Sequence, residues 1–361
     1  KAGERSGAPG ATAIVPLQVG ARSLAFPRLA AAGFWAWLIG AVLAVVSVLN
    51  NGGPNGGNAD FVDLFTLSAA LAAAGFLAGA VSLVTTILTT RAPGMNMRRV
   101  PFFTWSVLVA SLGLLVAMPV LIGQLLYVFV AHRHPSLSEL SGNRAFAEFA
   151  GFGFTQPTTI IFAIPVFGFF AEVVATFTRG RSRNRGLIFA GIGLVGVAVF
   201  GTVLQWPATL RTSFLDLSFG EKLKDLLPFA LVHGVPALGA LVAVALCAKG
   251  LSAKPTITAP LVFGLFSALL ALCGVAASAL NHVAGAGLIG TTFEEGTWLA
   301  LVFSAVLATM GAVTYWGPKW WGRSLPPKAV LPLALLAFAG AALAALPLMV
   351  AGFADQPGGV F

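Results

Sequence analysis

The sequence predicts an all-α integral membrane protein, a polytopic bundle of about nine transmembrane helices. Two observations lead to this fold class. Hydrophobic residues make up 58% of the 361 residues and charged residues only 9%, against roughly 25% charged residues in an ordinary soluble domain. The apolar residues also gather in long segments with almost no charge. Because lipid offers no hydrogen-bond partner to an open strand edge, such segments favour helices over strands.

Nine apolar segments follow one another along the chain. They are residues 34–49, 66–89, 105–130, 159–178, 186–204, 230–248, 257–280, 299–316 and 330–350. Most have about the 20 residues that an α-helix needs to cross roughly 30 Å of hydrocarbon. The connection 50–60 is rich in Asn and Gly, which is typical of turns. We therefore expect an amino-terminal segment and cytoplasmic loop over 1–33, a transmembrane helical bundle over 34–353, and an outer carboxy-terminal tail over 354–361.

The basic residues predict the orientation of the bundle. Sixteen of the 21 Lys and Arg residues lie on one set of alternate connections and five on the other. By the positive-inside rule, the first helix starts in the cytoplasm and the carboxy terminus lies outside, in a multi-pass protein of the bacterial plasma membrane. The net charge of +9 is divided among loops, most densely at 179–185. This pattern favours contact with anionic lipid headgroups over nucleic acid binding.

Five stretches of sequence resemble one known family. The longest is RAPGMNMRRVPFFTWS at 91–106, and the others are VPLQVG with AFPR within 15–28, MPV at 118–120, QP with IPVFG within 156–168, and YWGPK at 315–319. Taken in the order in which they occur along the chain, these stretches resemble cytochrome c oxidase subunit I of the heme-copper oxidase superfamily. The resemblance implies a match to helices three to eleven of that fold.

The family's chemistry needs side chains that this chain lacks. Family members reduce dioxygen at a heme iron and a copper ion held by six histidines, because imidazole suits both metals. This chain contains four histidines in all. We therefore expect no heme, copper or other cofactor, and a divergent member that has lost its metal ligands.

The resemblance implies which positions have changed. The metal-ligand positions of the sixth, seventh and tenth family helices fall on Gln156, Gln205, Trp206, Gly296 and Trp298, or on Trp298 and Ala300 for the tenth helix in a register shifted by two residues. The family's proton-path positions fall on Ser23, Thr158, Ile160, Ala237 and Ala240. The two glutamines could hydrogen-bond across a vacated cavity, and we expect Trp206 and Trp298 to fill part of it, because empty space in a packed interior is unfavourable.

Three sets of polar side chains remain as candidates for other roles. Glu172 lies inside an apolar segment, so it is either a functional intramembrane acid or a group that reaches the interface or pairs with an arginine there. His233 and His282 are predicted near the outer ends of their helices, where they could approach one another or Gln205. There they form either a metal site with Glu294 and Glu295 or, as we favour, ordinary interfacial contacts. The same choice applies to His132 and His134, which we place in an outer loop.

The leading interpretation is a non-catalytic, degenerate subunit I-like protein. It would act as a structural or scaffold subunit of a larger respiratory or membrane enzyme complex, with other membrane subunits as partners. One alternative is a subunit of a working terminal oxidase or electron-transport complex whose ligands come from other segments or from a partner. Another is transport of an ion or small molecule through the vacated cavity, with Glu172 as its sensitive residue.

Overall fold

Long apolar helices dominate the structure, a computed structural model that describes residues 10–53, 56–134, 136, 158–178, 184–204, 208–252, 255–323, 325–354 and 357–358. Within these ranges eight helices are long and apolar enough to cross a membrane, and a ninth apolar helix, Arg185–Gly201, is shorter. The prediction of an all-α polytopic bundle of about nine spans is thereby confirmed.

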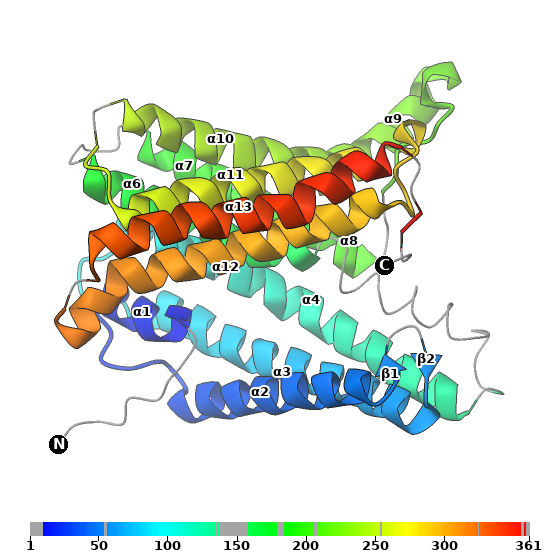
Figure 1. The fold of residues 1–361 in the computed structure, drawn as a ribbon, viewed down its shortest axis with the longest axis horizontal. Coiled ribbons are helices and arrows are strands. Elements are labelled where there is room, and N and C mark those ends of the chain that lie inside the picture. Colours follow the sequence, from blue (N-terminus) through cyan, green and yellow to red (C-terminus); the bar gives the residue numbers. More distant parts are fainter. Residues whose placement is uncertain are drawn as a thin grey trace. The chain divides into compact units, whose positions relative to one another are not determined.

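The helices follow the order of the predicted segments (Figure 1). They are α1 (Gly10–Val19), α2 (Pro27–Leu49), α3 (Ala59–Thr89), α4 (Phe102–Arg133), α6 (Thr158–Phe177), α7 (Arg185–Val195), α8 (Val199–Leu204), α9 (Phe219–Phe229), α10 (Val235–Leu251), α11 (Ala259–Asn281), α12 (Thr292–Trp321) and α13 (Pro327–Gly352). Three short 3₁₀ helices occur at Gly196–Ala198, Phe214–Asp216 and Ala284–Ala286, and a π-helix at Ala230–Gly234 joins α9 to α10.

Two parts of the chain differ from the sequence expectation in detail. The segment 1–33, expected to be a terminal segment and a loop, contains α1 and the first residues of α2, which begins at Pro27. Proline is suited to this first helical position, because it has no backbone N–H to leave unpaired there. The segment 186–204, expected as one helix, is interrupted between α7 and α8 by the 3₁₀ turn at Gly196–Ala198.

The connection between α2 and α3 is a small hairpin. Strands β1 (Gly52–Gly53) and β2 (Gly56–Gly57) pair antiparallel, with Gly52 opposite Gly57. Asn58 then caps α3, because its side chain accepts a hydrogen bond of 3.1 Å from the Asp60 N–H. The segment rich in Asn and Gly therefore forms the expected turn, and its last residue, Asn58, is the N-cap of α3.

The chain divides into two compact units, which we describe separately. The first unit comprises Lys1–Arg99, Ser111–Thr158 and Thr202–Gln205, and the second comprises Val100–Ala110, Thr159–Gly201 and Trp206–Phe361. In the first unit α2 and α3 pack side by side (Figure 1). A Cβ placed on Gly40 would lie 2.6 Å from the Ser68 carbonyl oxygen, so glycine is what allows the two backbones to approach.

The second unit is built around three helices that follow one another, α11, α12 and α13. Their shared core includes Phe263, Leu270, Phe293 and Leu307, all buried. Helix α13 nevertheless has only 22% of its apolar window buried inside the protein, and α2 of the first unit has 11%. In a multi-pass membrane protein such apolar outer faces are available to lipid or to neighbouring subunits.

Candidate functional site

Three of the five predicted metal-ligand positions cannot be placed. Gln156, Gln205 and Trp206 lie outside the described residues. The expectations that the two glutamines bond across a cavity and that Trp206 fills it therefore stay predictions. The other two positions, Gly296 and Trp298, lie on α12.

Gly296 faces the neighbouring helix α13. It is buried, and a Cβ built on it would lie 2.7 Å from the Ala345 carbonyl oxygen and 2.9 Å from the Met349 backbone nitrogen. Backbone atoms cannot move aside as a flexible side chain can. A histidine at this position would therefore require α12 and α13 to separate.

Trp298 does not have the role that we expected. Its side chain is 41% exposed, whereas Ala300, the alternative ligand position, is completely buried. The expectation that Trp298 fills an interior void is therefore wrong. Two residues along a helix correspond to a rotation of about 200°, so Trp298 lies on a different face from the buried Gly296 and Ala300.

Most of the positions predicted from the resemblance for a proton path carry side chains that cannot move protons. Ile160 is buried in α6, Ala240 is completely buried in α10, and Ala237 is partly buried. Thr158 is the first residue of α6. Ser23 is exposed in the linker between α1 and α2. Apolar carbon atoms at Ile160, Ala237 and Ala240 offer neither donors nor acceptors to a proton path.

Glu172 makes contacts that explain an acid inside an apolar helix. Its Oε2 accepts a hydrogen bond of 3.0 Å from the backbone N–H of Phe102, the first residue of α4. The first N–H groups of a helix have no partner within the helix, and the positive end of the helix dipole attracts a carboxylate. Glu172 thus caps α4 from the neighbouring helix α6.

Arg185 completes this Glu172 cluster, which consists of Glu172, Phe102, Val100 and Arg185. The Arg185 guanidinium donates to the Val100 carbonyl oxygen and lies 4.7 Å from the centre of the Phe102 ring. Its charge also acts on the Glu172 carboxylate. The interpretation of Glu172 as a group near an arginine therefore agrees with the geometry, although the arginine is Arg185 at the start of α7.

His233 and His282 do approach one another. Their rings stack with centroids 4.1 Å apart and an angle of 17° between the planes, and both residues are buried. His282 Nδ1 lies 2.7 Å from the Ser278 carbonyl oxygen, so this nitrogen carries the proton. Nearly parallel rings direct their in-plane lone pairs along nearly parallel lines, which do not converge on one metal ion.

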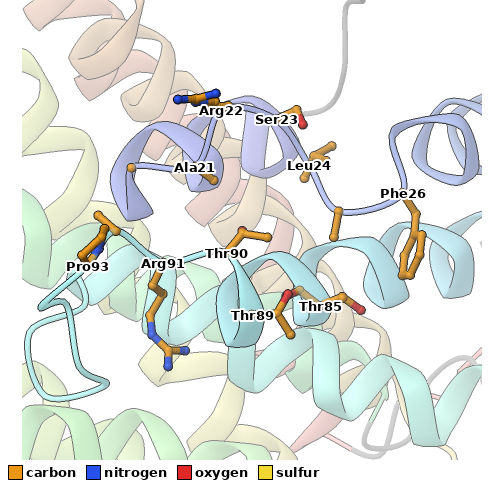
Figure 2. Close-up of a pocket in the computed structure, with 13 residues that line it drawn as sticks. Ala21, Arg22, Ser23, Leu24, Phe26, Thr85, Thr89, Thr90, Arg91 and Pro93 are labelled. Carbon is orange, nitrogen blue, oxygen red and sulfur yellow. The ribbon is translucent and has the colours of Figure 1, made fainter.

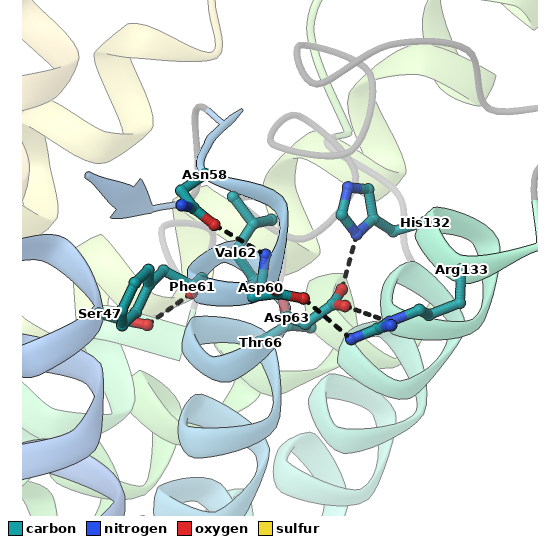
Figure 3. Close-up of polar contacts among 9 residues, drawn as sticks. All are labelled: Ser47, Asn58, Asp60, Phe61, Val62, Asp63, Thr66, His132 and Arg133. Atoms are coloured by element: carbon teal, nitrogen blue, oxygen red, sulfur yellow. Dashed lines mark hydrogen bonds and ion pairs between the residues drawn. The ribbon is translucent and has the colours of Figure 1, made fainter. Parts of the chain in front are cut away.

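One cluster was missed by reasoning from sequence. Asp63, in the first turns of α3, is 4% exposed. His132 Nδ1 lies 2.6 Å from its Oδ1, and Arg133 Nε pairs with its Oδ2 (Figure 3). Arg133 also reaches Asp60 at 3.6 Å. His132 therefore belongs to the end of α4 and to an ion-pair cluster, which we call the Asp63 cluster, and not to a loop.

A pocket of the first unit lies at the opposite end of α3. It has a volume of about 660 Å³ and is open on one side. Residues 20–26, in the linker from α1 to α2, form one wall, and Thr85 and residues 89–93, at the end of α3, form the other (Figure 2). We call it the linker pocket. It contains Ser23, one of the predicted proton-path positions.

The donors present do not fit the heme and copper that the family resemblance implies. Of the four histidines, His132 contacts Asp63 and His233 stacks on His282. None belongs to α6, α7, α8 or α12. Within the described ranges, no three His, Cys, Asp or Glu side chains come together as a metal site would require. The prediction that no cofactor binds remains a prediction.

Comparison with known proteins gives a consistent result. Residues 7–359 match the family described as Cytochrome C and Quinol oxidase polypeptide I. The chain is 33% identical over 202 residues to cytochrome c oxidase subunit 1 of Bacillus subtilis, covering 52% of this chain and 32% of the relative. It is 29% identical over 362 residues to a cytochrome c oxidase subunit 1-beta of Streptomyces avermitilis, covering 88% and 58%. The matched regions therefore span about a third to just over half of these relatives.

Proposed function

Because the chain belongs to the cytochrome c and quinol oxidase polypeptide I family, we propose that it is a non-catalytic member that serves as a structural subunit of a larger membrane complex. The observation that carries this proposal is at the predicted tenth-helix ligand position. There Gly296 packs against the α13 backbone with no space for a side chain. A subunit that keeps the helices but lacks the donors is suited to holding other subunits in place.

The polar clusters support the same proposal. Glu172 is engaged in capping α4, and the Asp63 carboxylate is engaged by His132 and Arg133. Both acids thus stabilise contacts between helices. A transport role that depends on Glu172 has less support, because its carboxylate already accepts a helix N–H. A second candidate is a subunit of a working electron-transport complex, which the names of the relatives favour.

The setting we propose is the bacterial plasma membrane. The arginines of the α1–α2 linker and of the loop after α3 would lie in the cytoplasm, and the Asp63 cluster would lie outside, as the distribution of Lys and Arg predicts. The broad apolar faces of α2 and α13 would then be available to neighbouring membrane subunits.

Isolation of the intact complex through a tag on this chain tests the proposal. We expect other membrane subunits to copurify in fixed ratio, while the chain, separated from them in mild detergent, shows no heme absorption band and no bound copper. A relative that retains its histidines, purified in the same way, serves as the positive control. Stoichiometric porphyrin or copper on the separated chain would overturn the proposal, as would a chain that purifies alone.

A further inference from the structure

The linker pocket joins a basic rim to an apolar wall. Its lining includes Arg22 and Arg91 and contains no acidic residue. Leu24, Ala25 and Phe26 supply apolar surface on the same linker, and Phe26 is 55% exposed (Figure 2). A cavity of this composition suits an amphiphile that carries a negative charge next to its apolar part.

The two arginines have different roles. Arg91 Nη1 donates to the Ile87 carbonyl oxygen at 2.6 Å and its Nε donates to the Met95 carbonyl oxygen at 3.1 Å. It therefore fixes the wall and compensates the negative end of the α3 dipole. Arg22 is exposed, and among the described residues no hydrogen bond or ion pair holds its guanidinium. Arg22 is thus the cation available to a ligand.

The charge around the linker pocket selects for anions. Arg28, Arg98 and Arg99 belong to the same end of the first unit as Arg22 and Arg91. The described acids of this unit, Asp60 and Asp63, lie at the other end of α3, about 35 Å away at 1.5 Å per residue. Among the described residues of this unit, the charge near the pocket is therefore positive, and a phosphate group would find several cations there and no carboxylate.

The backbone keeps the pocket in shape. The Ala25 N–H donates to Thr86 Oγ1 at 2.8 Å, and the Ala92 N–H donates to the Val19 carbonyl oxygen at 2.8 Å. The first bond joins the α1–α2 linker to the last turn of α3, and the second joins the end of α1 to the segment that follows α3. Phe26 has a φ of 58°, an unfavourable value for a bulky residue, so the linker is held in a defined conformation. The pocket is accordingly formed before any ligand arrives.

We propose that the linker pocket binds a phosphate group, that of an anionic phospholipid in the adjacent membrane leaflet. Arg22 contacts the phosphate, and Leu24 and Phe26 contact the glycerol and the start of the acyl chains. The membrane-spanning helices α2 and α3 place the pocket at the end of the bundle, where headgroups lie. The proposal depends on this placement and not on whether heme is absent.

Native mass spectrometry of the purified full chain tests this site. The probes are phosphatidylglycerol, phosphatidylcholine and inorganic phosphate, offered to the chain in detergent. We expect phosphatidylglycerol to be retained over phosphatidylcholine, and Arg22→Gln to weaken its retention about fivefold, as removal of one near-surface cation from an anionic lipid predicts. Arg28→Gln, which removes the same charge from a residue outside the pocket lining, should change retention less than about twofold.

Two results would contradict the proposal. Equal losses in both variants would indicate a diffuse positive field and no site. Displacement of the lipid by millimolar inorganic phosphate would indicate a site for the free anion. A Ser23→Glu variant places an acid in the pocket without removing an arginine, and it should also reduce retention. Equal thermal unfolding of the variants and the unchanged chain would show that loss of fold is not the cause.

Discussion

At the scale of single residues, one buried acid, Asp63, and one half-buried acid, Glu172, act between helices. Asp63 links the start of α3 to the end of α4, and Glu172 links α6 to the start of α4. An ionised carboxylate in such a place needs partners, because its desolvation is unfavourable. Each acid has a cation and at least one further hydrogen-bond donor beside it, and the consequence of removing either can be calculated.

Asp63→Asn should destabilise the protein by about 1–3 kcal/mol, because it leaves Arg133 and His132 without their anionic partner. Unfolding in mixed micelles with an increasing fraction of dodecyl sulfate measures this loss of unfolding free energy. Asp60→Asn is the matched control, since the Asp60 side chain is 87% exposed and its pair with Arg133 is 3.6 Å long. That control should cost less than about 0.5 kcal/mol. Equal losses for the two variants would show that burial of Asp63 is not the reason.

Glu172→Leu should cost about 1–2 kcal/mol, because α4 loses the acceptor for the Phe102 N–H. Hydrogen exchange at the Phe102 amide should become faster by the factor that corresponds to this loss of free energy. Glu172→Gln keeps a carbonyl oxygen at the same place, so it should retain most of the protection. If glutamine proves as harmful as leucine in both measurements, the negative charge itself is needed, and the transport alternative gains support.

At the scale of helices, the packing of the second unit depends on the close approach of α12 and α13. Gly296→Ala should destabilise the protein by about 1–3 kcal/mol, because a Cβ would meet the backbone of α13 at Ala345 and Met349. Gly340→Ala, on α13, is the control. No atom lies within 4 Å of a Cβ there, so the substitution should be neutral or stabilising by up to about 1 kcal/mol. The same micelle titration compares them, and a harmless Gly296→Ala would contradict the packing.

The helices could be predicted better than their interruptions. Length and apolar composition are enough to predict a membrane-spanning helix, because the thickness of the bilayer sets the length that such a helix needs. The 3₁₀ turn at Gly196–Ala198 and the π-helix at Ala230–Gly234 depend on how neighbouring helices pack, which a single sequence does not contain. The Asp63 cluster had a usable signal. Asp60 and Asp63 begin one helix and His132 and Arg133 end the next, so an antiparallel pair brings them to the same end.

At the scale of the whole molecule, motif order was more informative than any single residue. The motifs between 15 and 319 predicted the family, which the match over residues 7–359 confirms. The surroundings of individual site residues were harder to predict than the family. The places of His233 and His282 near helix ends left their approach open as one option, which the structure shows as a stack, whereas the exposure of Trp298 contradicts the expectation. The side of a helix that a residue occupies depends on its neighbours, and a tryptophan is stable facing either a core or a lipid interface.

The contact at Gly296 has a consequence for the history of the protein. If one mutation placed a histidine there, the imidazole would have no volume to enter, and the variant would lose stability before it gained a metal. Helix α13 would first have to retreat through changes of its own. A histidine ligand at this position is therefore hard to gain by single steps, since each first step is itself harmful.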